Sequence, residues 1–315
     1  MVKIATLTMN PAIDISANVG NIIPESKNRC SFYRNEPGGG GINVSRAIKR
    51  LGGSSTAFYL LGKTNGERLK VLLRREGIRQ RPVRVKSKTR ENITILEESS
   101  MIQYRFIMPG EGIAKTEWKS CLKEISSLKP NPDYMVASGS LPKGVPVDFY
   151  ARLNDVMREK NIKFIVDSSG EALRLAIESR IYMAKPNLRE FRQIAGADKK
   201  KKFETKDFAE KIIKRGQAEV LIISMGEKGA LVFTKDGEEH FKIPSVTTNS
   251  KIGAGDSMMG AVVFAMAKGK NAREAVRFGV AAGTAATMTP GTELCRREDV
   301  MRLYRKVSPI KGSER

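Results

Sequence analysis

Residues 252–258 read IGAGDSM: two glycines around a small residue, followed by the carboxylate of Asp256. Glycine lets a backbone turn sharply and approach a ligand closely. The apolar run 258–267 predicts a buried helix, and the start of a helix presents unpaired N–H groups that favour an anion. Such a turn suits phosphoryl transfer, because its amides would neutralise developing charge while the carboxylate takes a proton from a hydroxyl. The alternative is that Asp256 only caps the helix, a position that Asp favours.

The rest of the chain alternates between short apolar strands and helices. We expect strands at 4–9, 55–61, 134–137, 163–166, 181–184 and 219–224. We expect helices at 41–51, 66–76, 147–160, 208–215, 257–268 and 272–286. This order predicts an α/β fold with a mostly parallel, buried central sheet and helices on both of its faces.

Two regions break the alternation. Residues 92–97 and 103–108 flank the turn-like 98–100, which is typical of an antiparallel hairpin. Residues 13–34 are also β-like. The chain of 315 residues therefore predicts one core domain, 1–315, with a small sheet formed by inserted segments at about 12–36 and 88–109.

The composition excludes several classes of protein. Three widely spaced cysteines without a CxxC motif favour a reducing compartment and exclude a disulfide framework. The single histidine, His240, follows a turn-like segment and is expected at the surface, which argues against a Ser-His-Asp triad or a multi-histidine metal site. No run reaches the roughly 18 apolar residues of a membrane span, and the N-terminus lacks the features of a signal peptide. We expect a cytoplasmic protein with no membrane partner.

The net charge of +22 is concentrated in two places. Residues 68–90 contain ten Lys or Arg residues and one acid, Glu76, and residues 199–202 form a second basic run. Nucleic acid, an anionic membrane or a small anionic substrate would each suit such a balance. Nucleic-acid modules place aromatic residues among their basic ones, and 68–90 has none. We therefore favour a solvated basic surface and no nucleic-acid partner, and keep nucleic-acid binding as the competing hypothesis.

A second glycine run, GGGGINV at 38–44, opens the first expected helix. A dinucleotide site would place its glycines directly after the first strand, which ends nearly thirty residues earlier, and this spacing argues against such a site. Asn43 would then either hydrogen-bond sugar hydroxyls or simply face solvent.

Several polar residues follow expected strands, where ligands bind in such folds. In KPNLRE, 185–190, Asn187 and Glu190 would hold Mg²⁺ through waters or form a helix capping box. The turn SMGEKG, 224–229, would admit a nucleotide or be an ordinary tight turn. Asp14 would accept sugar hydroxyls. Arg90 and Arg105 would bind phosphate, unless they are only surface charges.

Together these motifs resemble the ribokinase-like (PfkB-type) carbohydrate kinases. The glycine run 38–44 and GAGD at 253–256 match the family's two signatures in order and separation, and 187–190 matches its N-x-x-E magnesium motif. The chain looks most similar to the sugar-phosphate branch of 6-phosphofructokinases, tagatose-6-phosphate kinases and 1-phosphofructokinases. Four segments carry that likeness: 10–14, 104–110, 166–173 and 277–283.

The resemblance implies a three-layer αβα fold with a small β-sheet lid over the sugar. It also implies ATP-dependent phosphorylation of fructose 6-phosphate to fructose 1,6-bisphosphate, with tagatose-6-phosphate kinase and 1-phosphofructokinase as alternatives. The catalytic residues would be the base Asp256 and the anion hole of Gly253, Ala254 and Gly255. The sugar phosphate would be bound by Asp14, Lys27, Gly39, Gly40, Asn43, Arg90, Arg105 and Ser140.

The same resemblance implies ATP, Mg²⁺ and a monovalent cation, K⁺, as cofactors. ATP would be bound by Lys185, Asn187, Ser224, Gly226 and Gly229. Glu190 would organise Mg²⁺ through water, and the monovalent cation would be held by Ser250, Ile252, Ala286, Thr289 and Gly291. The lid would also pair two subunits into a homodimer. A kinase of unphosphorylated sugars or nucleosides is a further alternative, against which the cations Lys27, Arg90 and Arg105 argue.

Overall fold

A computed structural model describes residues 3–196 and 204–309, so the basic run at 199–202 lies outside the described residues. Its main sheet contains β1 (Ile4–Thr8), β4 (Thr56–Gly62), β5 (Arg79–Val85), β8 (Tyr134–Ser138), β9 (Lys163–Asp167), β10 (Ile181–Ala184), β11 (Ala218–Ser224), β12 (Ala230–Thr234) and β13 (Gly237–Phe241). These nine strands lie in the order β13-β12-β11-β10-β9-β8-β1-β4-β5. The pairs from β11 to β5 are parallel, and β12 and β13 add an antiparallel edge. The expected α/β fold with a mostly parallel sheet is confirmed.

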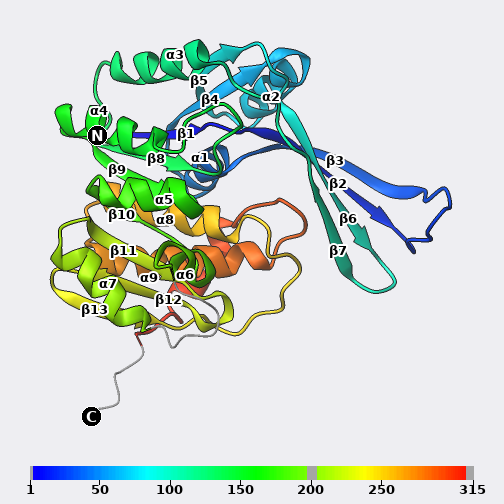
Figure 1. Ribbon diagram of the computed structural model, residues 1–315. Helices are drawn as coiled ribbons and strands as arrows, with labels where there is room; N and C mark the ends of the chain where they lie inside the picture. Colours follow the sequence, from blue (N-terminus) through cyan, green and yellow to red (C-terminus); the bar gives the residue numbers. More distant parts are fainter. Residues whose placement is uncertain (1–2, 197–203, 310–315) are drawn as a thin grey trace.

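Helices cover both faces of this sheet (Figure 1). One face carries α1 (Gly40–Arg50), α2 (Lys63–Arg75), α8 (Ala254–Ala267), α9 (Ala272–Thr287) and α10 (Arg297–Tyr304). The other carries α3 (Lys115–Ser126), α4 (Phe149–Glu159), α5 (Gly170–Glu178), α6 (Leu188–Ile194) and α7 (Thr205–Lys214). Because side chains alternate along a strand, Ile4 of β1 packs against the first group and Leu7 against the second. Helix α8 is apolar nearly all round because it is packed between α1 and α9.

A small second sheet projects from one side of the main body (Figure 1). It contains β2 (Ala12–Val19), β3 (Cys30–Gly38), β6 (Arg90–Glu97) and β7 (Ile102–Ile107), in the order β3-β2-β6-β7. The expected hairpin is present, since β6 and β7 pair antiparallel with Ile95 opposite Tyr104. The two halves of the sheet join through a parallel pair, β2 with β6.

The basic segment 68–90 lies mainly on α2 and β5. Strand β5 forms one edge of the main sheet, and its Arg79, Arg81 and Arg84 are exposed. Charged side chains on an edge strand discourage pairing with another chain. Much of the positive charge therefore lies on a solvated edge, which explains why β5 lacks the apolar alternation that would have predicted a strand.

The segment before His240 is not a turn, as expected, but part of strand β13. The residue lies in β13, where it is half-buried, and one of its ring nitrogens lies 2.7 Å from the carbonyl oxygen of Lys228. Within the described ranges, every helix is too short or too polar to cross a membrane.

Candidate active site

A cavity of about 280 Å³ opens at the carboxyl ends of the central strands. It lies where β8 and β9 end and where α1, α6 and α8 begin. The lining residues are Gly40, Ser138, Gly139, Ser140, Asp167, Ser168, Ser169, Glu190 and Asp256. The carboxyl ends of parallel strands are where ligands bind in doubly wound sheets. The structure therefore brings the two glycine motifs, more than two hundred residues apart, to one cavity.

Helix α8 begins earlier than expected, at Ala254, with Gly253 as its N-cap. Gly253 is left-handed (φ 73°), a conformation that favours glycine, and a Cβ there would lie 2.5 Å from Leu294 Cδ2, which would have to move. No side chain caps this helix. The interpretation of Asp256 as the N-cap is therefore wrong. Its carboxylate instead accepts a hydrogen bond of 2.9 Å from Asn43 Nδ2.

The environment of Asp256 favours its protonated form. Burial, followed by repulsion from Asp167, raises the pKa of Asp256 to about 6. The hydrogen bond from Asn43 and the charge of Lys185 oppose this shift without cancelling it. A carboxylate with this pKa is still ionised at neutral pH and is a better proton acceptor than an ordinary aspartate.

Lys185 and Asp167 form a buried ion pair beside Asp256. Lys185 Nζ lies 3.2 Å from Asp167 Oδ2, and the lysine side chain is 5% exposed. Burial raises the pKa of Asp167, although Lys185 opposes the shift. Burial acts to lower the pKa of Lys185, but the carboxylates of Asp167, Asp256 and Glu190 together outweigh burial, and the net shift is upward.

Asp167 is a site residue that the sequence analysis missed. Its signal was a carboxylate at the end of an apolar strand, followed directly by Ser-Ser-Gly at 168–170. The serines that follow it, Ser168 and Ser169, line the cavity with it. This is the place where polar residues of a parallel sheet meet a ligand.

The glycine run 38–41 passes in contact with the ends of β1 and β8. A Cβ on Gly40 would lie 2.3 Å from Ser138 Oγ, and one on Gly41 would lie 2.3 Å from the carbonyl oxygen of Leu7. Gly39 has φ 109°, a conformation that favours glycine. These contacts hold α1 so close to the sheet that Asn43 is buried, and the alternative that Asn43 faces solvent is wrong.

Asn187 and Glu190 form the capping box that starts α6. Asn187 Oδ1 accepts from the Glu190 N–H at 2.9 Å, and Glu190 Oε2 accepts from the Asn187 N–H at 2.8 Å. Glu190 also lines the cavity, and its pKa is raised, first by burial. The capping interpretation is confirmed. Only Oε2 of Glu190 takes part in the capping box, and its second carboxylate oxygen does not.

The other nucleotide-site candidates lie one strand further along the sheet. Ser224 ends β11, and its N–H donates to the carbonyl oxygen of Pro186 at 3.0 Å. Gly226 begins η1 (Gly226–Lys228), a turn of 3₁₀ helix, and Gly229 follows it with φ 88°. A Cβ on Gly229 would lie 1.9 Å from the Phe241 carbonyl oxygen. These residues form a tight turn beside the start of α6.

The small sheet contributes a second group of polar residues. Asp14 accepts a hydrogen bond of 2.8 Å from Asn92 Nδ2, and burial raises its pKa although Arg46, Arg105 and Arg90 oppose the shift. Arg105 on β7 is exposed. Lys27 is exposed in the connection between β2 and β3, at the far end of the small sheet, so the structure does not bring it to the cavity of its own chain.

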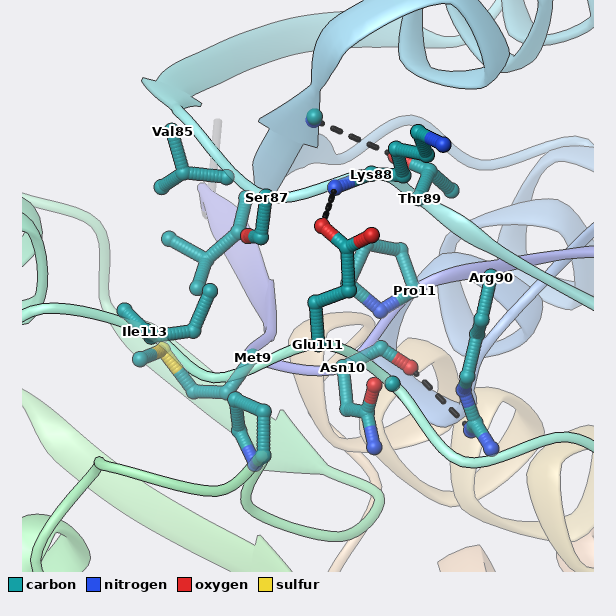
Figure 2. A pocket seen from close by; sticks show the side chains of 14 residues that line it. Met9, Asn10, Pro11, Val85, Ser87, Lys88, Thr89, Arg90, Glu111 and Ile113 are labelled. Atoms are coloured by element: carbon teal, nitrogen blue, oxygen red, sulfur yellow. Dashed lines mark hydrogen bonds between the residues drawn. The ribbon is translucent and has the colours of Figure 1, made fainter.

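A joint fastens the small sheet to the main body around a cavity of about 20 Å³, room for about one water molecule (Figure 2). Glu111 accepts from the Lys88 N–H at 2.7 Å, and the Thr89 hydroxyl accepts from the Gly62 N–H at 3.2 Å. Arg90 donates to the Asn10 carbonyl at 3.3 Å, and burial lowers its pKa. Asn10 also donates to Ser140 Oγ at 3.2 Å, which connects this joint to the larger cavity.

The five cation-site candidates lie in segments that meet next to α8. The Ser250 N–H donates to the Thr287 carbonyl at 3.1 Å, and the Ile252 N–H donates to Ser250 Oγ at 3.2 Å. The Thr289 hydroxyl donates to the Ala286 carbonyl at 2.8 Å. Gly291 has φ 57°. Among residues 3–196 and 204–309, no three Asp, Glu, His or Cys side chains gather closely enough to hold a metal ion unaided.

Comparison with known proteins places the chain among sugar kinases. The model of the pfkB family of carbohydrate kinases matches residues 4–299. ATP-dependent 6-phosphofructokinase isozyme 2 of Mycobacterium tuberculosis is 39% identical over 96% of this chain and 89% of its own. The crystal structure of phosphofructokinase-2 from Escherichia coli in complex with potassium is 38% identical, with a TM-score of 0.92 over 97% of this chain and 99% of its own. A 1-phosphofructokinase of Bacillus subtilis is 32% identical over 92% of this chain and 95% of its own.

Proposed function

The chain belongs to the pfkB family of carbohydrate kinases, and we propose that it transfers the γ-phosphoryl group of ATP to fructose 6-phosphate, giving fructose 1,6-bisphosphate. The observation that carries this proposal is the start of α8, where the Asp256 carboxylate faces the cavity next to a helix that no side chain caps. A proton acceptor beside free backbone amides is the arrangement that phosphoryl transfer to a hydroxyl requires.

In the proposed reaction, Asp256 takes the proton of the attacking sugar hydroxyl as the new O–P bond forms. The bond between the γ-phosphorus and its bridging oxygen breaks, and ADP leaves. Because this transition state is loose, catalysis depends mostly on positioning and on charge neutralisation. The amides of Gly253, Ala254 and Gly255 would receive the negative charge of the transferred group.

ATP would lie between this turn and the ends of β10 and β11. Lys185 would neutralise phosphate charge, a role supported by its ammonium, which lies 3.5 Å from where a Cβ on Gly255 would stand. Asn187, Ser224, Gly226 and Gly229 would border the rest of the nucleotide.

The cavity residues also fit Mg²⁺, which prefers one or two carboxylates together with waters and substrate phosphates. Glu190 and Asp167 both line the cavity, while the described residues offer no all-protein cage. Glu190 would hold the ion through water, with Asp167 nearby. When bound, Mg²⁺ would neutralise charge on the phosphates.

Asp14, Gly39, Gly40 and Asn43 would hold the sugar. Ser140, Arg90 and Arg105 would bind its phosphate, and these cations favour a phosphorylated sugar over a neutral one. Lys27 would reach a phosphate only from a second copy of the chain, since it lies at the far end of its own small sheet.

The small sheet supports a homodimer. Its exposed apolar residues are Tyr33 on the edge strand β3 and Ile102, Tyr104 and Phe106 on the opposite edge strand β7, each between 37% and 61% exposed. The strand register places all four on the same face of the sheet. An apolar patch on a projecting sheet is typical of an interface. A second copy is the proposed occupant, with the sheet also acting as a lid that excludes water from the sugar. Phe106→Asp is expected to give a monomer in analytical ultracentrifugation.

A monovalent cation is also proposed, because the solved E. coli relative is in complex with potassium. Ser250, Ile252, Ala286, Thr289 and Gly291 would hold it, mostly through carbonyl oxygens. Because these segments adjoin the start of α8, the cation would stabilise the turn around Gly253. Replacing K⁺ with tetramethylammonium is expected to lower kcat without unfolding the protein.

The substrate is tested by ADP release over fructose 6-phosphate, tagatose 6-phosphate, fructose 1-phosphate, ribose and adenosine. We expect the highest kcat/KM for fructose 6-phosphate. The 1-phosphofructokinase among the relatives makes fructose 1-phosphate the second candidate. A preference for ribose or adenosine would contradict the sugar-phosphate assignment. Salt-sensitive DNA binding without ADP release would replace it by the nucleic-acid hypothesis.

A further inference from the structure

Arg46 of α1 has 0% exposure and, within the described ranges, is the largest of the fully buried side chains. A charge buried this completely is costly unless every donor is satisfied. Its guanidinium donates twice to Glu76, at 2.8 Å each, and once to Glu36, at 3.1 Å. It also donates to the carbonyl oxygen of Pro37 at 3.0 Å and to Asn43 Oδ1 at 3.2 Å.

The contact with Asn43 decides which way that amide points. A guanidinium only donates hydrogen bonds, so the oxygen of Asn43 must face Arg46. The NH₂ group of Asn43 is then directed to the other side, where it donates to Asp256 Oδ2 at 2.9 Å. With the opposite orientation, an amide oxygen would face the Asp256 carboxylate and repel it.

We propose that Arg46 is a positioning residue for catalysis, which orients the Asn43 amide so that it donates to Asp256 and holds that carboxylate for proton transfer. This inference rests on the proposed role of Asp256 as the base. Arg46 does not line the cavity, and its contact toward Asp256 runs through Asn43.

The partners of Arg46 connect this orientation to the small sheet. Glu36 and Pro37 belong to β3, and the glycine run connects the end of β3 to the start of α1. Glu36 is itself held by the Thr292 hydroxyl and by Arg34, 3.3 Å away. The base is therefore positioned from β3, a strand of the proposed lid. Replacing a buried ion pair by apolar residues is often neutral for stability, so stability alone does not explain this cluster.

Other charged groups also face Asp256, and one of them, Asp14, itself feels the charge of Arg46. They are Asp167 at the end of β9, Lys185 after β10 and Asp14 on β2. Because each of them also acts on the Asp256 carboxylate, a change in activity on mutating Arg46 would not by itself show that Arg46 acts through Asn43. The test must show that the effect of Arg46 passes through Asn43.

A double-mutant cycle provides that test. Gln at position 46 can accept as well as donate, so it no longer fixes the orientation of the Asn43 amide. Arg46→Gln is combined with Glu76→Gln so that Glu76 does not lose its partner as an unpaired carboxylate, whereas Glu36 keeps its partner Arg34. Relative to Glu76→Gln alone, we expect kcat of ADP release to fall by roughly 10- to 100-fold, since misplacing a reacting group costs about that much. In an Asn43→Ala background the same change should alter kcat by less than about 2-fold.

Three controls separate positioning from folding. Arg46→Lys keeps a donor-only side chain and should restore most of the kcat lost in the Gln variant. Arg50→Gln, one turn further along α1 and 27% exposed on its side chain, should leave kcat unchanged. Thermal unfolding of each variant identifies those that fold. If Arg46→Lys does not fold, the Arg46→Gln/Glu76→Gln pair still decides the question.

Equal losses from the Arg46 change with Asn43 intact and in the Asn43→Ala background would overturn the inference. That failure is distinguishable from a failure of the proposed function. An enzyme that still depends on the Asp256 carboxylate but shows no coupling overturns only the role of Arg46. An enzyme that turns over without that carboxylate overturns the proposed base and the inference together.

Discussion

Helices α6 and α8 begin at the same cavity, and each carries an acidic residue at its third helical position. In α6, Asn187 is the N-cap and Glu190 completes a capping box, so both side chains bind backbone amides of their own helix. In α8, Gly253 is the N-cap and offers no side chain, and Asp256 is bound by Asn43 from another helix.

The difference shows how the same position serves two purposes. A carboxylate that closes a capping box is partly committed to the helix, and it is held in place by that bond. A carboxylate at an uncapped start is free to exchange a proton, and the helix amides beside it are free to bind an anion.

The largest effect is expected from Asp256→Asn, which keeps the shape of the side chain and removes the base. ADP release should fall by about 10²- to 10⁴-fold, the usual worth of general-base help. Near wild-type turnover would show that Asp256 is not the base and does not differ from Glu190 in this way. The folded protein should be as stable as before or more so, by on the order of 1 kcal/mol, because the raised pKa means that ionised Asp256 is unfavourable in the fold.

The pH profile should report the same carboxylate. Burial raises the pKa of Asp256 from 3.8 to about 6. Since the base works only when deprotonated, kcat/KM should be constant above about pH 6 and fall tenfold per pH unit below it. Ionised Asp256 also destabilises the fold, and this destabilisation is absent below pH 3.8 and complete above about pH 6. If kcat/KM falls only near pH 4, the Asp256 carboxylate is more solvated than proposed.

A smaller effect is expected from Glu190→Gln. Gln also completes a capping box, so the free energy of unfolding should change by less than about 0.5 kcal/mol. The charge is lost, and the Mg²⁺ concentration for half-maximal activity should rise by about tenfold. Glu274→Gln, in the first turn of α9 away from the cavity, is the matched control and should leave the Mg²⁺ requirement unchanged. An unchanged requirement in Glu190→Gln would limit Glu190 to capping.

The smallest effect is expected from Asn187→Ala, which removes the cap of α6 at a cost of about 1 kcal/mol in urea unfolding. Asn271 caps α9 with the same bond of 2.9 Å, so Asn271→Ala should cost a similar amount. Only the change at Asn187 should raise the KM for ATP. If both variants keep the wild-type KM, Asn187 is a cap and does not contact the nucleotide.

Much of the architecture was predictable because buried strands and amphipathic helices leave periodic patterns. Strand β10 has the expected bounds, and α1 and α9 begin and end within one residue of the prediction. Strand β5 was missed because an edge strand needs no apolar alternation, and its Arg79 and Arg81 suit solvent. The start of α8 was placed three residues late because its first turn, Ala254 to Asp256, is not apolar.

The site was predictable where glycine is required and unpredictable where partners meet through space. The sequence by itself determined the glycine turn at 253–255, the glycine run at 38–41 and the sugar-kinase family, because backbone conformation and close approach restrict which residues can stand there. Only the tertiary structure decided that Asn43 binds Asp256, that Asp167 pairs with Lys185 and that Arg46 is buried. Such contacts join residues far apart in the chain, and their pKa shifts arise from burial, which a linear pattern does not record.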